Sequence, residues 1–451
     1  MSTEVDVVIV GLGPGGEHVA AELAKADLEV VAVDQHLVGG ECPYYGCVPT
    51  KMMVRAAGVL AEGRRIPELA GTSTVTEDWT PVAERIAAEA TDDWDDQVAV
   101  DRLKEAGVTF VRGHGRLTAP RTVEVGDQTF VARRGVVLNT GTEPGVPPID
   151  GLDETPYWTN RDAVKLTELP GSLIVIGGGA IGAELSQVFA RFGVSVTLLE
   201  VADRILAVEE PESSAVLTEV FGNEGIQVVG AANITSVEYA DGHFSVHLDD
   251  QVLQADKLLV AAGRRPNLPN LGLDTVGLDA SAKSVETDDR MRAGDGLWAI
   301  GDITGKGAFT HVSMYQADVA VRDILGQEGP AADYRAVPRV TFTDPEIGSV
   351  GITEQQARDA GLQVRVGVAQ VPSSSRGWIH KVGNEGLIKL VEDADRGVLV
   401  GATSAGPTGG EVLSALTVAV HAQVPTATLA SMIYAYPTFH RAIEDALKDL
   451  H

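Results

Sequence analysis

Residues 5–16 read VDVVIVGLGPGG, an apolar run that passes directly into a glycine-rich turn. The apolar part predicts a buried strand, and residues 17–25 continue with a helical pattern. Between the two, Gly11, Gly13 and Gly16 form the pattern G-x-G-x-x-G. In this setting the glycines allow a tight turn and a close approach of the backbone to a pyrophosphate at the helix N-terminus. The glycines alone would also fit an accidental turn, but the strand and the helix around them favour a dinucleotide-binding fold.

The same arrangement occurs a second time, after a Pro-rich linker at residues 144–150. Residues 173–176 predict another apolar strand, and Gly177, Gly179 and Gly182 lead into the helix that follows it. Because the fingerprint is complete in both places, the chain is predicted to bind two dinucleotides.

Each copy ends its second strand in an acidic residue, Asp34 in the first copy and Glu200 in the second. Both acids lie 23 residues after the first glycine of their motif (34 − 11 and 200 − 177). A carboxylate at this position accepts hydrogen bonds from ribose hydroxyls and repels a 2′-phosphate. Glu200 therefore predicts NADH rather than NADPH at the second site, although the nearby Arg204 works against this preference.

Both cysteines of the 451-residue chain lie within residues 39–51, GGECPYYGCVPTK. Pro49 suits the first turn of a helix over residues 50–63, which would put Cys47 near a helix N-terminus. There the partial positive charge favours a thiolate and lowers the pKa of the thiol. The spacing of Cys42 and Cys47 therefore predicts a redox-active disulfide. The alternatives are two structural cysteines or half of a zinc site, for which no second Cys/His cluster supplies the remaining ligands.

Composition narrows the classes of function. The chain has 44% hydrophobic and 22% charged residues, as ordinary globular proteins do, and its length predicts about three domains. The 35 Lys and Arg against 64 Asp and Glu give a net charge of −29, which argues against a nucleic-acid or anionic-membrane partner. The sequence shows neither a signal peptide nor a long apolar run, so we expect no membrane span and a cytoplasmic location. In that reducing compartment a disulfide is catalytic rather than structural.

The rest of the chain predicts a return to the first fold and then a separate domain. Gly141 follows a strand at residues 136–138, where a glycine allows close approach of the backbone to a ligand, and Gly263 follows a strand at residues 258–262. Asp302 ends a further strand, where its carboxylate binds a ligand hydroxyl or caps the next turn. The remaining expected elements are short strands at 108–111 and 122–125, one or two helices within 64–97, strands at 339–342, 364–371, 386–391 and 398–404, and helices from Thr353, over 410–423 and within 434–450.

Together these features resemble the flavin-dependent pyridine nucleotide-disulfide oxidoreductases, the family of dihydrolipoamide dehydrogenase, glutathione and mycothione reductases and mercuric reductase. The resemblance covers essentially the whole chain. It implies an α/β fold with two Rossmann-like dinucleotide-binding domains and a C-terminal α+β dimerisation domain. The implied domains are residues 1–150 with 271–335 for FAD, residues 151–270 for NAD, and residues 336–451 for the interface of a homodimer.

The resemblance also implies roles for individual residues. FAD would be bound by Gly11, Gly13, Gly16, Asp34 and Asp302, and NADH by Gly177, Gly179, Gly182 and Glu200. Gly141, Gly263 and His311 complete the cofactor-binding set. Lys51 and Glu184 would form an ion pair beside the flavin and nicotinamide, Cys47 would be the charge-transfer thiol, and Cys42 the thiol that meets the substrate. Electrons would then pass from NADH through the flavin to the disulfide and on to a small-molecule acceptor.

One departure from the family concerns its C-terminal His-Pro-Thr-x-x-Glu motif, a base and its orienting acid supplied by the partner subunit. Here Tyr436 stands in place of the base and Arg441 in place of the acid. A phenol with an ordinary pKa of about 10 is a poor base near neutrality, although it can donate a proton or a hydrogen bond. His440 and Glu444 lie four residues apart on a helix expected to begin at Pro437. They predict either a displaced catalytic dyad or an ordinary helix-surface contact.

A second departure is Glu41, where the family usually has threonine. A carboxylate beside Cys42 disfavours the thiolate and favours a cationic partner. The tail at residues 445–451 lacks the cysteine pair that mercuric reductases add, which disfavours that activity. The prediction is therefore an NADH-dependent FAD enzyme that reduces a disulfide-type acceptor. A diaphorase-like quinone or metal-ion reductase is the enzymatic alternative, and a catalytically idle flavoprotein subunit is the non-enzymatic one.

Overall fold

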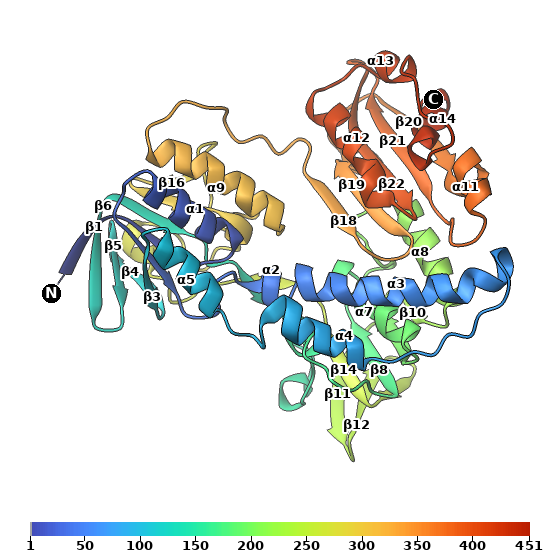
Figure 1. The fold of residues 1–451 in the computed structure, drawn as a ribbon, viewed down its shortest axis with the longest axis horizontal. Coiled ribbons are helices and arrows are strands. Elements are labelled where there is room, and N and C mark those ends of the chain that lie inside the picture. Colours follow the sequence, from blue (N-terminus) through green and yellow to red (C-terminus); the bar gives the residue numbers. More distant parts are fainter. Residues whose placement is uncertain (1) are drawn as a thin grey trace. The chain divides into compact units, whose positions relative to one another are not determined.

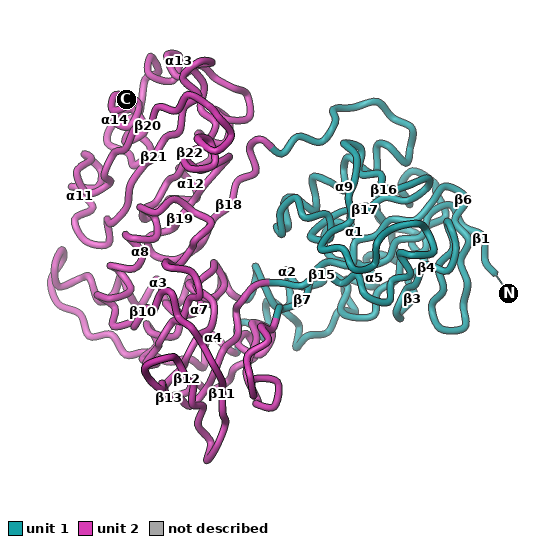
Figure 2. Tube along the Cα trace, turned by 180° about the vertical axis from the view of Figure 1, so that it is seen from behind, with its two compact units in different colours: residues 1–49, 84–145, 264–334 teal, residues 50–83, 146–263, 335–451 magenta. Residues whose placement is uncertain are grey.

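The computed structural model describes residues 2–451, and its chain separates into two compact units (Figure 1, Figure 2). The first unit consists of Met1–Pro49, Glu84–Gly145 and Arg264–Tyr334, and the second of Thr50–Ala83, Val146–Gly263 and Arg335–His451. Each unit therefore gathers three separate stretches of sequence. The chain first passes from one unit to the other within helix α3, Cys47–Leu69.

A mainly parallel sheet forms the centre of the first unit, in the strand order β16-β17-β6-β1-β2-β3. Its strands are β1 Ser2–Val10, β2 Val30–Asp34, β3 Thr109–Arg112, β6 Gln128–Leu138, β16 Arg292–Gly294 and β17 Leu297–Ala299. Only β16 runs antiparallel to its neighbour along this path. Strand β6 also pairs with β5 (Thr122–Val125), which pairs with β4 (Gly115–Ala119).

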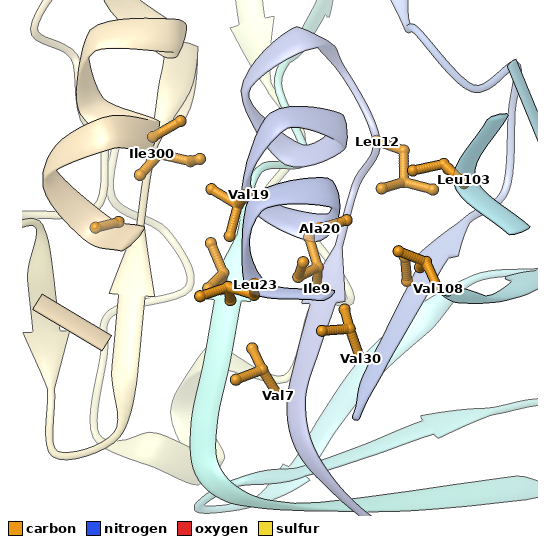
Figure 3. Close-up of a cluster of buried hydrophobic side chains, with 14 of the residues drawn as sticks. Val7, Ile9, Leu12, Val19, Ala20, Leu23, Val30, Leu103, Val108 and Ile300 are labelled. Carbon is orange, nitrogen blue, oxygen red and sulfur yellow. The ribbon is translucent and has the colours of Figure 1, made fainter. Parts of the chain in front are cut away.

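Successive side chains of β1 point alternately to the two faces of this sheet. Val7 and Ile9 are fully buried on the face covered by α1 (Pro14–Lys25), α5 (Gln97–Glu105) and α9 (Thr310–Ile324). Figure 3 shows these two side chains against helix α1. On the other face Val8 and Val10 pack in a second core with the β4–β5 hairpin. Burial on both faces explains why β1 reads as a nearly continuous apolar run.

Several short elements complete the first unit. They are α2 Glu41–Tyr44, the π-helix η1 Ile86–Thr91, β7 Thr142–Pro144, β15 Arg264–Pro266, and the 3-10 helices η3 Leu273–Val276 and η4 Gly301–Thr304. Strands β7 and β15 pair antiparallel although they are far apart in sequence. This pairing brings the residues after Gly141 and after Gly263 together.

The second unit contains its own parallel sheet, in the order β10-β9-β8-β14. Its elements are η2 Leu152–Glu154, α6 Asn160–Ala163, β8 Ser172–Ile176, α7 Ala180–Arg191, β9 Ser195–Leu199, α8 Pro211–Asn223, β10 Gln227–Val229 and β14 Lys257–Val260. A small antiparallel sheet is inserted before β14 and consists of β11 Ile234–Ala240, β12 His243–Leu248 and β13 Val252–Ala255. Phe244 of β12 is fully buried in the core that joins the two sheets.

The C-terminal part of the second unit is an antiparallel sheet in the order β18-β19-β22-β21-β20. Its strands are β18 Pro338–Thr341, β19 Glu346–Gly351, β20 Val364–Gln370, β21 Leu387–Asp393 and β22 Val398–Gly406. The accompanying helices are α10 Glu354–Asp359, η5 Val371–Ser373, α11 Ser375–His380, α12 Gly409–His421, α13 Thr426–Ala430, η6 Phe439–Arg441 and α14 Ala442–Lys448. Residues of α12 and α14 pack against the apolar side chains of the sheet.

The structure confirms the predicted fold class and corrects several elements. Helix α3 begins at Cys47 itself and continues to Leu69, beyond the predicted 50–63. The segment 64–97 holds the end of α3, then α4 (Thr80–Arg85) and η1. Strand β19 was not predicted, because its sequence EIGSVG lacks a clear alternating pattern. No helix begins at Pro437 in the described chain, where η6 starts two residues later and leads into α14.

Candidate functional site

The first glycine turn closes because two of its glycines approach other backbone atoms closely. Gly11 has a φ of +96°, and a Cβ there would lie 2.3 Å from the carbonyl oxygen of Asn139. A Cβ on Gly16 would lie 2.1 Å from the carbonyl oxygen of Gly11. The N–H of Gly11 donates to the carbonyl of Val33 at 2.8 Å, which ties the turn to β2. Gly11 and Gly16 are therefore required by the fold itself.

Gly13 lies between them and has a different environment. It is the N-cap of α1, and the nearest atom to an added Cβ is Asn139 Nδ2 at 3.4 Å, an ordinary contact. Within residues 2–451, no side chain caps the helix at this position. The first N–H groups of a helix without such a cap form an anion site that the helix dipole strengthens. The turn thus fits the pyrophosphate of a dinucleotide, with Gly13 on the open side.

The second glycine turn repeats this construction. Gly177 has a φ of +109°, and its Cβ would lie 2.4 Å from the carbonyl oxygen of Ala261. A Cβ on Gly182 would lie 1.9 Å from the carbonyl oxygen of Gly177. At Gly179, the N-cap of α7, an added Cβ meets nothing within 4 Å among the described residues. The same division into two fold-determining glycines and one open glycine therefore occurs in both copies.

The predicted ribose-binding acids are fixed to these turns by matching hydrogen bonds. Asp34 Oδ2 accepts from the N–H of Leu12 at 2.6 Å, and Glu200 Oε2 accepts from the N–H of Gly178 at 2.6 Å. Burial raises the pKa of Asp34, against the backbone hydrogen bonds that lower it. Each carboxylate is thus held at the carboxyl edge of its sheet, directly beside the middle of the glycine motif.

Arg204 is occupied by its own loop. Its guanidinium donates to the carbonyl oxygens of Leu206 at 3.1 Å, Ala207 at 2.9 Å and Glu209 at 2.9 Å. These contacts direct the side chain to the chain that follows β9. The cation that could have received a 2′-phosphate is therefore engaged elsewhere in this structure.

Glu17 lies in the first turn of α1, close to the open side of the first glycine turn. Burial raises its pKa to about 7, and the nearby carboxylates of Asp34 and Asp96 add to the effect, while Arg102 opposes it. Burial therefore favours the protonated form of Glu17 more strongly than it does for an exposed glutamate. A neutral Glu17 does not oppose an anion at the helix N-terminus.

The cysteine pair connects two helices. Cys42 is the second residue of α2 and is half-buried, and Cys47 is the first residue of α3 and is exposed. The Sγ of Cys47 lies 3.6 Å from the Oγ1 of Thr310, the first residue of α9. The structure thus confirms that Cys47 lies at a helix N-terminus, that of α3. The N-terminus of a second helix, α9, lies beside it. Tyr44, between the cysteines, is buried, and this burial raises its pKa to about 12.

Asp302 lies on η4, and its Oδ2 accepts a hydrogen bond from the hydroxyl of Thr142 at 2.6 Å. The same hydroxyl accepts from Nε of Arg264 at 2.6 Å. A second guanidinium nitrogen of Arg264, Nη2, lies 3.2 Å from Oε2 of Glu41, the residue before Cys42. The structure therefore joins Glu41 and Asp302 through two side chains that the sequence analysis did not single out.

The remaining cofactor-binding candidates lie at helix and strand ends. Gly141 (φ +63°) and Gly263 (φ +107°) both have open space where a Cβ would stand, among the residues described. Gly141 is also held through its carbonyl, which accepts from the N–H of Asn267 at 3.0 Å. His311 follows Thr310 on α9, and its ring stacks on that of Phe309 with centroids 5.2 Å apart. Their ligand contacts stay predictions.

Lys51 and Glu184 form the ion pair that the resemblance implied. Nζ of Lys51 on α3 lies 2.6 Å from Oε2 of Glu184 on α7. The Glu184 side chain is 5% exposed, and its other oxygen accepts from the N–H of Phe342 at 2.8 Å. Lys51 Nζ also lies 4.8 Å from the centroid of the Phe342 ring. The pair is therefore desolvated on the carboxylate side and fixed by backbone.

Tyr436 and Arg441, which stand in place of the base and acid of the family motif, contact each other. The guanidinium of Arg441 lies over the ring of Tyr436, 5.6 Å from its centroid, and its Nη2 lies 3.0 Å from Oε2 of Glu444. Glu444 also pairs with Lys448 at 2.7 Å. The predicted pairing of His440 with Glu444 is wrong, because His440 lies in the tight turn of η6 and its Nε2 is 3.5 Å from the hydroxyl of Thr438.

The structure also shows site residues that were not identified from the sequence, and most of them contact and position the predicted site residues. Asn139 approaches the carbonyls of both Gly11 and Gly13 through Nδ2 at 3.4 Å. Thr142 stands directly after Gly141, and Arg264 stands directly after Gly263. That position was the available signal, because such residues line the carboxyl edge of a parallel sheet.

Residues 5–322 match the family described as pyridine nucleotide-disulphide oxidoreductase, and residues 337–447 match the dimerisation domain of that family. Dihydrolipoyl dehydrogenase from Chlorobaculum tepidum is 32% identical, with 100% of this chain and 97% of that protein covered. Mercuric reductase from Staphylococcus aureus is 32% identical over 92% of this chain and 77% of its own.

A solved structure is similar over almost the whole length. It is a Cu(II) complex of the HOCl-induced flavoprotein disulfide reductase RclA from Escherichia coli, with a TM-score of 0.85, 25% sequence identity and 99% of both chains covered. Among residues 2–451, no helix has both the length and the apolar character needed to cross a membrane.

Proposed function

This chain belongs to the pyridine nucleotide-disulphide oxidoreductase family, and from that membership we propose that it uses NADH to reduce a disulfide-type small-molecule acceptor through Cys42 and Cys47. The family depends on FAD and NAD(P), so the class of enzyme follows from membership. The choice of NADH, the acceptor and the roles of individual residues are the proposal.

The position of Cys47 carries the proposal. Its sulfur is at the start of α3 and 3.6 Å from the first side chain of α9, so the positive ends of two helix dipoles meet near it. A thiolate is the nucleophile in thiol–disulfide exchange, and this setting favours it. Two buried structural cysteines would not need such a setting.

The exchange step takes place between the acceptor and the two cysteines of this chain. FAD, when bound at the first glycine turn, supplies two-electron transfer between the nicotinamide coenzyme and the cysteine pair. The reduced Cys42 thiolate attacks the acceptor disulfide, which forms a mixed disulfide and releases one thiol. The Cys47 thiolate then attacks the sulfur of Cys42, which releases the second thiol and closes the Cys42–Cys47 disulfide. Two electrons pass to the acceptor, and its two sulfurs leave as thiolates that take up the two protons lost by Cys42 and Cys47 on ionising.

Two observations support NADH over NADPH. Glu200 is held beside the second glycine turn by the N–H groups of Gly178 and Ala202, at 2.6 and 2.8 Å. Arg204 donates to three carbonyls of its own loop. A fixed carboxylate, beside an Arg204 that is engaged by its own loop, suits a free 2′-hydroxyl. We expect Glu200→Ala to weaken NADH binding more than NADPH binding.

The proposal is tested by counting thiols. The anaerobic FAD-loaded protein is treated with NADH, then alkylated and analysed by mass spectrometry. We expect NADH to expose two alkylatable cysteines in the parent, and Cys47→Ser to show one label with or without NADH. If NADH bleaches the flavin but exposes no thiols, the disulfide is not in the electron path. If NADH does neither, the chain is an idle flavoprotein.

A second candidate is reduction of a metal ion or a quinone, and the likeness to a Cu(II) complex of RclA favours the metal ion. The variant Cys42→Ser distinguishes disulfide reduction from reduction of a metal ion or a quinone. We expect this variant to lose turnover with oxidised lipoamide. Retention of NADH-dependent Cu(II) or quinone reduction by the same variant would assign that activity to the flavin rather than to the cysteine pair.

The assembly is also a proposal. The match to a dimerisation domain at residues 337–447 and several exposed apolar side chains in this part, Ile433 (99% exposed), Trp378 (75%) and Val418 (64%), support a homodimer. The domain boundaries 1–150 with 271–335, 151–270 and 336–451, and the cytoplasmic location, stay predictions. Light scattering on the purified protein would measure the mass.

A further inference from the structure

Glu41 has a cationic partner in the structure. Its carboxylate lies 3.2 Å from Nη2 of Arg264, the first residue of β15. Both side chains are largely withdrawn from water, with 25% of Glu41 and 21% of Arg264 exposed. An ion pair withdrawn to this degree is screened less than a surface pair. The charge that the sequence placed beside Cys42 is therefore compensated within the first unit.

The orientation of the connected hydroxyl is fixed by its neighbours. Arg264 has only donors, so Oγ1 of Thr142 must accept from Nε of Arg264 at 2.6 Å. The Thr142 O–H is then left to donate to Oδ2 of Asp302 at 2.6 Å. Arg264 also donates from Nη2 to the carbonyl of Thr142 at 2.8 Å. The Arg264 guanidinium thus contacts the Glu41 carboxylate directly, and it is linked to the Asp302 carboxylate through the Thr142 hydroxyl.

We propose that Glu41 and Arg264 form a charge-balancing pair that positions the Cys42 turn and sets the reactivity of the Cys42 thiol. This inference rests on the proposed function, in which Cys42 is the sulfur that meets the acceptor. Glu41 is a positioning residue, because it acts on Cys42 through the local charge and through α2. Glu41 stands at the position before the first redox cysteine, where the family usually has a threonine.

The sign of each effect follows from the charges. Without the Glu41 carboxylate, Arg264 loses a neighbouring anion, and its positive charge near α2 favours the Cys42 thiolate. Without the Arg264 charge, the Glu41 carboxylate loses a cationic neighbour, and its negative charge next to Cys42 disfavours the thiolate. A cation near a thiol favours the thiolate, and an anion near it disfavours the thiolate. The two single variants should therefore shift the pH at which the Cys42 thiol ionises in opposite directions.

The experiment measures iodoacetamide labelling of Cys42 between pH 5 and 10. The full-length FAD-loaded Cys47→Ser protein is the parent, because the chain has only two cysteines and one thiol then remains. We expect Glu41→Gln to lower the pH midpoint of labelling by about half a unit to one unit, and Arg264→Gln to raise it by a similar amount. In the double variant the midpoint should return to within about 0.2 units of the parent.

Two further variants keep the test decisive if Arg264→Gln does not fold. Arg264→Lys retains the charge and should keep the parent midpoint. Glu143→Gln removes the partner of Arg265, an adjacent but separate ion pair, and should leave the midpoint unchanged. Equal midpoints for Glu41→Gln and the parent, or shifts of the same sign in both single variants, would overturn the proposal. The readout needs no NADH, so failure of the proposed function would appear separately, as the absence of NADH-dependent thiols.

Discussion

Nζ of Lys51 lies 2.6 Å from Oε2 of Glu184, but the two side chains are unequally exposed, at 35% and 5%. The cost of breaking the pair should follow this asymmetry, because a buried charge without its partner is strongly destabilising. We expect Lys51→Met to lower the free energy of unfolding by about 3 kcal/mol, as it leaves the Glu184 carboxylate uncompensated. Glu184→Gln should cost less, because Lys51 retains access to water and the amide still accepts from Phe342. Urea denaturation of both variants measures the order, and a larger loss for Glu184→Gln would contradict it.

The glycine turns allow structural and ligand-binding roles to be separated. Gly182→Ala should destabilise the second unit, because its Cβ would stand 1.9 Å from a carbonyl oxygen. Gly179→Ala should unfold within a few degrees of the parent, because its Cβ meets nothing within 4 Å in the described chain. It should nevertheless bind NADH about tenfold more weakly, since a methyl group stands where the pyrophosphate approaches. Calorimetry of NADH binding and thermal unfolding test both expectations. Unchanged NADH affinity in Gly179→Ala would place the pyrophosphate elsewhere.

The repeated nucleotide fold was predictable because its determinants are local. Strand, glycine turn, helix and terminal acid follow one another within about 30 residues, and each has a strong pattern of its own. The structure adds that Asp34 and Glu200 accept from the same position of their motifs, the residue after the first glycine. The spacing of 23 residues thus reflects a hydrogen bond as well as a ligand position.

The parts that could not be predicted depend on contacts between distant residues. Arg264 meets Glu41 and Thr142 only because β7 and β15 pair, and neither short strand has a pattern that identifies its partner. The Lys51–Glu184 pair, 133 residues apart, came from the family resemblance and not from spacing. The His440–Glu444 prediction failed because it assumed one continuous helix, whereas the chain turns tightly through η6 before α14.

Glu17 predicts a pH dependence of stability. Its pKa rises from 4.5 to about 7 in the folded chain, chiefly through burial. Between these two values the folded state binds more protons than the unfolded state, so stability falls as the pH rises through this window. Glu17→Gln removes this contribution and should therefore stabilise the protein more at pH 8 than at pH 5. Thermal unfolding at both pH values measures it, with Glu22→Gln as control, a half-exposed residue of the same helix that pairs with Lys25. Equal effects of Glu17→Gln at both pH values would contradict the prediction.

Tyr436 is 69% exposed, and its ring is held by Arg441 rather than by an acid. If the phenol donates a proton to a leaving thiolate, Tyr436→Phe should keep the ring contact and the fold but lower disulfide turnover by about 100-fold. NADH-dependent reduction of Cu(II), which needs no such proton, should change less than twofold.

The competing explanation places the acid–base group at His440. His440→Ala should leave disulfide turnover within twofold of the parent, because Glu444 is occupied by Arg441 and Lys448. The double variant Tyr436→His, Arg441→Glu restores the family pattern of base and acid, and should raise turnover near pH 7, where imidazole titrates and phenol does not. Steady-state rates with oxidised lipoamide from pH 6 to 10 distinguish the two. Loss of turnover in His440→Ala, with Tyr436→Phe unaffected, would return the role to the displaced histidine.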